Sequence, residues 1–304
     1  MYTMLVSAEQ LRQGLKAQEP WLIFDVRHDL ADHDAGRRNY EEGHIPGALY
    51  LDHERQLSAP RTGRNGRHPL PALRDFAGLM RTQGLAPGTQ VAVYDASGGM
   101  FAAHLWWMLR WLGHEKAAVL DGGWQAWLQA GGEAQRGPNT APGRDRGALD
   151  PAPGMPQADA GGASLPEGGA CVPAMPTVDA DTVLANIGQP VFKVVDARAP
   201  ERFRGETEPM DPVAGHIPGA LNRPNSLNLA PDGRFKPAAQ LRGEFTALLG
   251  DTAPGQVVHQ CGSGITASHN LFAMELADLR GSVLYPGSWS EWCSDPARPV
   301  ATGG

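Results

Sequence analysis

The heptapeptide GHIPGAL occurs twice in this chain without change, at residues 43–49 and 215–221. Further matches follow in the same order along each half, pairing residues 24–27 with 195–198, residues 91–94 with 257–260, and residues 122–127 with 287–292. A repeat on this scale indicates that one folding unit has been duplicated. We therefore expect two domains with the same fold.

Each half alternates short apolar segments with amphipathic ones. Residues 91–94 and 257–260 are typical of buried strands, and residues 267–279 carry apolar side chains at helical spacing. This alternation predicts an α/β fold of two tandem domains, each a mainly parallel sheet with helices on both faces. A chain of 304 residues is long enough for each domain to bury a core of its own.

The segment between the two halves has a different composition. Residues 137–173 contain 15 Gly or Pro among 37 residues and almost no periodic apolar pattern. Such a segment cannot bury enough apolar surface to fold alone, which predicts a linker. The predicted domains are then residues 1–136 and residues 174–304.

Composition narrows the classes of function. No apolar run approaches the length of a membrane helix, and the first residues lack an export signal, since Ser7 and Gln10 suggest a helix capping box. The three cysteines, Cys171, Cys261 and Cys293, have neither disulfide nor zinc-type spacing, which favours a reducing, cytoplasmic setting. A net charge of −7 without a Lys/Arg cluster argues against nucleic acid and anionic membranes as partners. A small substrate or a protein partner is expected.

One cysteine occupies a position suited to catalysis. Cys261 directly follows the strand predicted at residues 257–260 and opens the turn CGSGIT, residues 261–266, before a helix. The two glycines let successive amides point inward, and this nest together with the helix dipole favours the thiolate, a nucleophile. The alternative is an ordinary buried cysteine. Because the first half has Asp95 at the matching position, we expect one reactive and one supporting domain.

The surroundings of the thiol restrict its chemistry. Cysteine phosphatases need an arginine six positions after the cysteine, and that position is Ala267. A cysteine protease needs a histidine base; His259 lies two residues before Cys261, but no protease signature surrounds it. The remaining hypothesis is attack by the thiolate on sulfur, with the loop holding a persulfide.

Taken together, the repeated GHIPGA segments, the Asp-x-Arg strand ends, the tryptophan motifs and the loop CGSGIT resemble the two-domain sulfurtransferases of the rhodanese superfamily. The resemblance covers nearly the whole chain apart from the linker. It implies two rhodanese-like domains, the second one catalytic, and a ping-pong reaction. A small anionic donor passes sulfur to Cys261, and a thiol, cyanide or thioredoxin-type acceptor removes it. No cofactor or metal is implied. We expect a monomer, because one domain already covers the active face of the other.

Within this family the loop indicates the donor. Cys261-Gly-Ser-Gly-Ile-Thr266 is similar to the CGSGVT loop of mercaptopyruvate enzymes, whereas thiosulfate enzymes usually carry basic residues there. The resemblance implies that Ser263 works with His68 and Glu54 of the first domain as a proton relay, which thiosulfate does not need. The alternative for His68 is a surface loop histidine.

The resemblance also implies a set of donor-binding groups. Arg202 falls on the first carboxylate-binding arginine of the family. Asp211 stands where mercaptopyruvate enzymes usually have the second arginine, so Arg204 is the candidate substitute. The backbone of the loop supplies the remaining groups, at Gly262, Gly264, Ile265 and Thr266. We expect 3-mercaptopyruvate as donor, with thiosulfate, or a sulfur relay without turnover of its own, as alternatives.

Residues that recur in both halves are expected to be structural, because only one half carries the thiol. This applies to His44 and His216, which would fix turns by hydrogen bonds to the backbone. Cys293 is expected to be inert.

Overall fold

The computed structural model describes residues 1–139 and 174–304. The first domain contains a five-stranded parallel sheet in the order β1-β5-β4-β2-β3. Its strands are β1 (Leu5–Val6), β2 (Trp21–Asp25), β3 (Leu49–Tyr50), β4 (Gln90–Tyr94) and β5 (Ala117–Leu120). Its helices are α1 (Ala8–Lys16), α2 (Ala35–Glu42), α3 (Leu73–Thr82), α4 (Met100–Trp111) and α5 (Gly123–Gln129).

The second domain repeats this topology. Its parallel sheet has the order β7-β6-β8-β9, and Thr177 forms a parallel bridge to Leu284, in the place that β1 occupies in the first sheet. The strands are β6 (Lys193–Asp196), β7 (Leu221–Asn222), β8 (Val257–Gln260) and β9 (Val283–Leu284). The helices are α6 (Ala180–Gly188), α7 (Pro200–Phe203), α8 (Ala238–Leu249), α9 (Ile265–Leu276) and α10 (Ser288–Trp292), with 3₁₀ turns η1 (Asn225–Asn228) and η2 (Pro254–Gln256).

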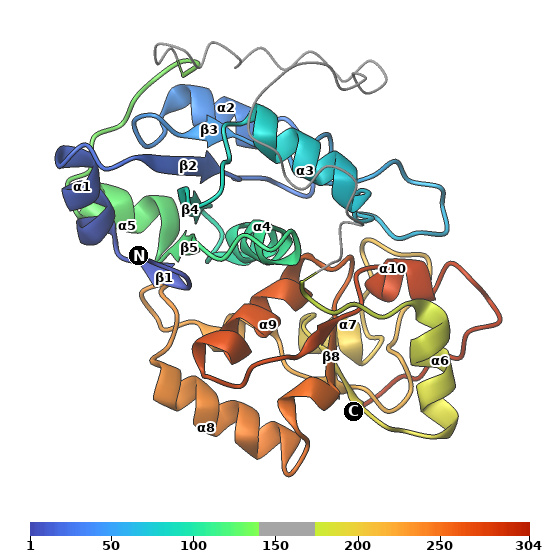
Figure 1. Ribbon diagram of the computed structural model, residues 1–304. Helices are drawn as coiled ribbons and strands as arrows, with labels where there is room; N and C mark the ends of the chain where they lie inside the picture. The colour runs from blue at the N-terminus through green and yellow to red at the C-terminus, as the bar shows by residue number, and fades with distance from the viewer. Residues whose placement is uncertain (140–173) are drawn as a thin grey trace.

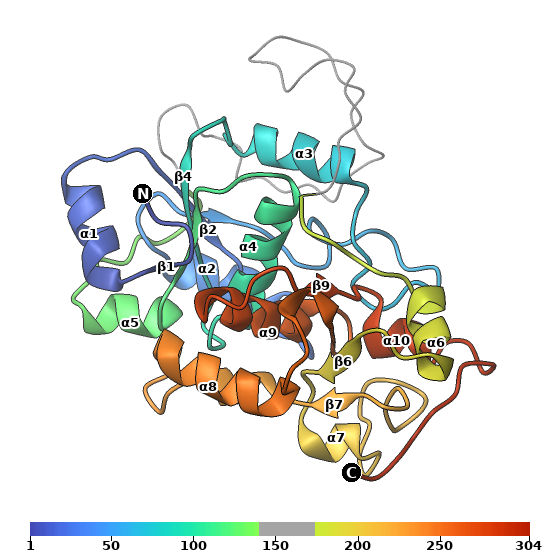
Figure 2. The same ribbon diagram turned by 60° about the horizontal axis from the view of Figure 1, so that its bottom comes forward.

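Helices cover both faces of each sheet. In the first domain α3 and α4 pack on one face and α1 and α5 on the other; in the second domain α8 and α9 lie opposite α6 and α10. Figure 2 shows α8 beside α9, with α6 and α10 together on the other side. The predicted α/β fold of two tandem parallel domains is confirmed.

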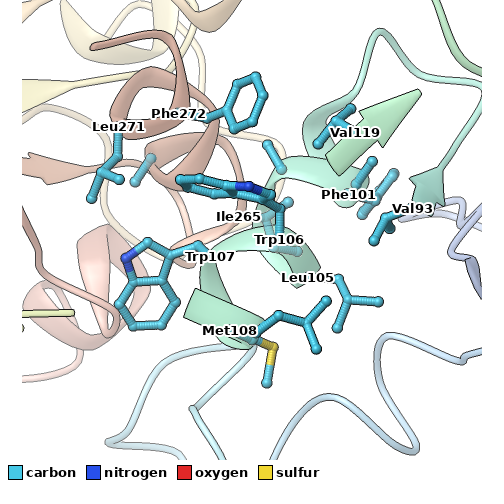
Figure 3. Packing of buried hydrophobic residues seen from close by; sticks show 14 of the residues in the cluster. Val93, Phe101, Leu105, Trp106, Trp107, Met108, Val119, Ile265, Leu271 and Phe272 are labelled. Carbon is cyan, nitrogen blue, oxygen red and sulfur yellow. The ribbon is translucent and has the colours of Figure 1, made fainter. Parts of the chain in front are cut away.

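The two domains meet along α4 and α9, which face each other between the sheets (Figure 1). Both helices are buried nearly all round; α4 accordingly carries apolar side chains on every face, whereas α9 also buries the polar residues Ser268, His269 and Asn270. Trp106 of α4 packs edge-on against Phe272 of α9, with ring centroids 4.8 Å apart, and Trp107, Ile265 and Leu271 surround this contact (Figure 3). The active face of the second domain is therefore held against the first by a continuous apolar core.

Side-chain caps set the starts of two helices. The Ser7 hydroxyl accepts the Gln10 amide and the Gln10 side chain accepts the Ser7 amide, so the predicted capping box is present. Asp179 caps α6 by accepting the amide of Thr182 at 2.8 Å.

The predicted linker, residues 137–173, falls mainly outside the described residues. Asn139 is still packed on the first domain, since its side chain donates to the carbonyl of Gly47 at 3.0 Å. At the first described residue of the second domain, the amide of Ala174 donates to the carbonyl of Trp111 at the end of α4. Among residues 1–139 and 174–304, no helix is long and apolar enough to span a membrane.

Candidate active site

Cys261 lies at the carboxyl end of β8, at the start of the turn that leads into α9. Its Sγ atom accepts hydrogen bonds from the amides of Ser263 (3.4 Å) and Gly264 (3.2 Å). Gly264 has φ +90°, and a Cβ there would lie 2.8 Å from the carbonyl oxygen of Pro286. Only glycine lets the chain curl at this point so that both amides face the sulfur. The predicted nest of inward-facing amides is therefore present around the thiol.

The helix α10 holds this loop from behind. The amide of Cys261 donates to the Ser288 hydroxyl at 3.1 Å, while the amides of Trp289 and Ser290 donate to the carbonyls of Cys261 and Gly262. Each of these bonds joins the loop to residues 287–292, the tryptophan-containing segment of the repeat. The position of the thiol is thus fixed by backbone contacts on both sides.

A cavity of about 70 Å³ opens over the thiol. Both domains line it: the second domain contributes Cys261 to Ser263, Ile265, Thr266, Arg202 and Met210, and the first contributes Leu30, Arg67, Met100 and Phe101. A larger hollow of about 350 Å³ lies elsewhere along the domain boundary, between Leu70, Asp179 and Glu291, and Cys261 does not line it. The small cavity is the candidate site, because Cys261, the predicted nucleophile, lines it and its volume suits a molecule of a few atoms.

His68 reaches the loop from the first domain. Its Nδ1 lies 2.7 Å from the Ser263 hydroxyl oxygen, and its Nε2 lies 3.5 Å from Glu54 Oε1, beyond ordinary hydrogen-bond range. His68 is 4% exposed, so the alternative of a surface loop histidine is wrong. The structure brings together the three side chains of the predicted relay.

Both His68 and Glu54 favour the form without a proton. Burial lowers the pKa of His68, and the nearby charge of Glu54 only partly opposes that effect. The contact with His68, together with the charge of Arg61, lowers the pKa of Glu54 to about 2. At neutral pH the site therefore holds a neutral imidazole beside a carboxylate, an arrangement suited to accepting one proton.

Two arginines face the cavity. Arg202 donates to Glu208 Oε1 at 2.6 Å and lies 3.5 Å from Asp211 Oδ2. Arg67 forms an ion pair with the same Asp211, and its Nη2 lies beside Gly262. The carboxylate of Asp211 thus lies between two guanidinium groups and orients both of them toward the loop.

Sequence reasoning missed Arg67. The only signal was its place next to His68, because the loop that carries His68 to Ser263 necessarily carries Arg67 to the cavity as well. A basic residue from the other domain could be assigned to this site only once the two domains were in contact.

The predicted role of Arg204 is not supported by its position. Its guanidinium is 40% exposed and pairs with Glu206 at 2.7 Å, and Arg204 does not line the cavity. Arg204 follows the last residue of α7 and keeps helical dihedral angles, and side chains two positions apart on a helix face different directions, so Arg202 and Arg204 diverge.

The repeated histidines are structural, as expected. His44 Nδ1 contacts the carbonyl of Tyr40 at 2.8 Å, and His216 Nδ1 contacts that of Phe203 at 2.7 Å. Cys293 is 8% exposed, and burial raises the pKa of its thiol to about 11, which agrees with an inert residue.

Comparison with known proteins gives the family. The model of the rhodanese-like domain matches residues 7–130 and 179–295. The chain is 46% identical over 302 residues to a Pseudomonas aeruginosa protein named "Probable 3-mercaptopyruvate sulfurtransferase", covering 98% of each chain. It is 34% identical to human 3-mercaptopyruvate sulfurtransferase, covering 95% of this chain and 91% of that one.

A solved structure agrees in fold. SseA from Escherichia coli, a 3-mercaptopyruvate sulfurtransferase, superimposes with a TM-score of 0.71 at 29% identity, covering 95% of this chain and 99% of that one. The family inferred from the sequence motifs is therefore confirmed. The chain belongs to the rhodanese family and carries two rhodanese-like domains.

Proposed function

We propose that this protein is a sulfurtransferase that takes sulfur from 3-mercaptopyruvate onto Cys261 and passes it to a thiol, cyanide or thioredoxin-type acceptor. One observation carries the choice of donor: the 2.7 Å contact between His68 and Ser263, which joins a proton-accepting group to the loop of the nucleophile. The names of the relatives support the same activity.

The reaction needs one proton to move. The Cys261 thiolate attacks the sulfur of the donor, an S–S bond forms, and the C–S bond breaks with its electron pair passing to carbon as the enolate of pyruvate. The donor thiol proton then has to reach that carbon. Ser263, His68 and Glu54 relay it, and the products are the Cys261 persulfide anion and pyruvate.

The amides of the loop hold the charge. The amides of Ser263 and Gly264, which donate to Sγ, turn toward the outer sulfur once the persulfide has formed. One such preorganised donor contributes about 3–4 kcal/mol in comparable anion sites. Gly262, Ile265 and Thr266 line the space that the donor occupies.

The donor carboxylate binds beside Asp211, to Arg202 Nη1 and Arg67 Nη2, which both lie near Gly262 at the cavity. A guanidinium grips a carboxylate with two parallel hydrogen bonds, which orients the C–S bond toward the thiolate. Mercaptopyruvate enzymes usually have their second arginine at the position of Asp211, and here Arg67 of the first domain supplies that second positive charge. Asp211 pairs with both arginines and keeps them in place.

Thiosulfate is the second candidate donor. Asp211, at the position where mercaptopyruvate enzymes usually have arginine, favours it. Thiosulfate transfers sulfur with release of sulfite and without movement of a proton, so the relay would be idle. A cytoplasmic monomer fits both alternatives, since the first domain of the same chain completes the cavity.

The relay gives the test. We expect His68→Ala and Ser263→Ala each to lower kcat/KM for mercaptopyruvate by about 10²–10⁴-fold and to change kcat/KM for thiosulfate little. His114→Ala, distant from the cavity, serves as the matched control. Equal losses with both donors, or a strong preference of the wild type for thiosulfate, would overturn the assignment of the donor. If neither donor is turned over, the remaining alternative is a protein that relays sulfur without turnover of its own.

The arginines are tested by a matched set. Arg202→Lys and Arg67→Lys keep the charge but lose the two-pronged grip, so the KM for mercaptopyruvate rises more than kcat falls. Arg204→Lys, whose guanidinium is outside the cavity, should leave both constants unchanged. A response at Arg204 equal to that at Arg67 would contradict the proposed carboxylate site.

A further inference from the structure

Five of the ten histidines of the chain gather beside the contact of His68 with Ser263. They are His28, His33, His53, His68 and His104, and neighbouring ring centroids lie 5.2–6.5 Å apart. The proposed sulfur transfer uses only His68. The other four rings therefore need a separate explanation.

His28 is the least satisfied member of this group. It follows β2, is 7% exposed, and neither Nδ1 nor Nε2 has a hydrogen-bond partner among the described residues. A buried polar group without a partner destabilises the folded state. A neutral imidazole with an unused lone pair is also a ready ligand for a metal ion.

The neighbours of His28 complete a set of ligands. One ring nitrogen of His28, one of His33 and one carboxylate oxygen of Glu54 all lie within 4.8 Å of one another. His33 Nδ1 is already 3.3 Å from Glu54 Oε2. In a tetrahedral zinc site with bonds near 2.0 Å, two ligand atoms lie about 3.3 Å apart. A shift of at most about 1.5 Å closes the set.

We propose that His28, His33 and Glu54 form a binding site for a divalent transition-metal ion, best matched by Zn²⁺, at the edge of the active-site cavity. Two imidazoles and one carboxylate suit zinc and leave a fourth position for water. Magnesium and calcium, which prefer shells made of oxygen, do not fit this set.

The site is joined to the cavity in two ways. Phe101, which lines the cavity, packs edge-on against His28, with ring centroids 5.3 Å apart. Glu54 offers Oε2 to the metal site and Oε1 to His68. A metal ion on Glu54 neutralises the carboxylate that supports protonated His68, so occupancy inhibits sulfur transfer from mercaptopyruvate. This inhibition rests on the proposed function; the binding itself does not.

Binding is tested with Co²⁺, whose visible absorption reports tetrahedral coordination. The full-length, untagged Cys261→Ser protein is titrated, so that the reactive thiol cannot bind the ion. We expect visible bands, and an apparent Kd at least about tenfold weaker after His33→Ala or His28→Phe. His33 is half exposed, so its variant tests the site even if His28→Phe fails to fold. His114→Ala is the matched control.

Several results would overturn the site. These are no visible bands, an affinity unchanged by His33→Ala, or a cobalt–thiolate band that persists in that variant and reports binding by another cysteine. A second arm uses the protein with Cys261 intact, where Zn²⁺ should lower mercaptopyruvate turnover and His33→Ala should relieve that inhibition with basal turnover unchanged. If Co²⁺ binds as expected but Zn²⁺ does not inhibit, the metal site stands and the role of Glu54 in the proposed function fails.

Discussion

The two loops that follow β4 and β8 share one backbone design but differ in the group that they enclose. In the second domain the Cys261 sulfur receives two amides, at 3.2 and 3.4 Å. In the first domain the carboxylate of Asp95 receives four amides, from Ser97, Gly99, Phe101 and Ala102, at 2.8–3.0 Å. Both loops end at a left-handed glycine, Gly99 or Gly264, that begins the next helix.

The difference explains why only one loop can react. The carboxylate of Asp95 is fully buried and fills the nest with the chain's own negative charge, so that no donor can enter. Burial raises the pKa of Asp95, and the four amides oppose that effect by binding the charged form. In the second loop the smaller contact with sulfur leaves amides and space for an incoming anion.

Each loop also receives a histidine from the opposite domain. His269 of α9 places Nε2 3.0 Å from the carbonyl oxygen of Gly98, whereas His68 meets the hydroxyl of Ser263. A carbonyl has no proton to exchange, and a hydroxyl has one. The reciprocal contact of His269 only joins the two domains, whereas that of His68 also involves a group that can exchange a proton, as the proposed relay requires.

Removal of the Cys261 thiol is expected to have the largest effect, a loss of sulfur transfer. Cys261→Ser should lower kcat/KM at least about 10³-fold and abolish the mass increase of one sulfur atom that donor treatment gives. Cys293→Ser, the matched control, should keep both. Turnover that survives in Cys261→Ser would end the account of a cysteine persulfide.

Removal of the Asp95 carboxylate should lower the stability of the fold and leave turnover unchanged. Asp95→Ala leaves four buried amides without a partner, so the free energy of unfolding should fall by about 3 kcal/mol while turnover of the folded protein is unchanged. Urea unfolding measures the loss, with the exposed Asp232→Ala expected within about 0.5 kcal/mol of wild type. Loss of turnover at unchanged stability would make the first loop a functional one.

Substitution of the matching glycines, Gly264 and Gly99, distinguishes the cost of backbone strain from an effect on turnover. A Cβ at Gly264 would lie 2.8 Å from the Pro286 carbonyl oxygen, and one at Gly99 3.2 Å from Phe235, so Gly264→Ala and Gly99→Ala should each cost at least about 1–2 kcal/mol of stability. Only Gly264→Ala should also lower kcat/KM, by about tenfold or more, because it displaces an amide at the sulfur. Equal turnover in the two variants would contradict the role of that amide.

The smallest effect concerns pH. Because burial lowers the pKa of His68, its ring stays neutral until the pH falls below 6.5, and mercaptopyruvate turnover should decline only there as the ring takes up a proton. Glu54→Gln removes a charge that raises this pKa, so the decline should move to lower pH. The pH profile of kcat/KM measures the shift, and a shift to higher pH would be the wrong sign.

Much of this protein could be predicted from short stretches of sequence. The repeat, the capping box at Ser7 and the loop after Cys261 depend on residues a few positions apart, whose backbone preferences act locally. The relay of Ser263, His68 and Glu54 was inferred from family resemblance, and its members do lie together. Their catalytic roles, like the domain limits at 136 and 173, stay predictions.

Other features were decided only by the tertiary structure. Arg67 reaches Asp211 across 144 positions of sequence, Arg204 turns away from the cavity, and the buried His28 lies near Glu54 within the first domain. Sequence patterns report the period and end of an element, but the partners of a side chain depend on how the elements pack, and the pair of Arg67 with Asp211 depends on how α4 packs against α9. That packing is set by the whole apolar core at once, and no single motif encodes it.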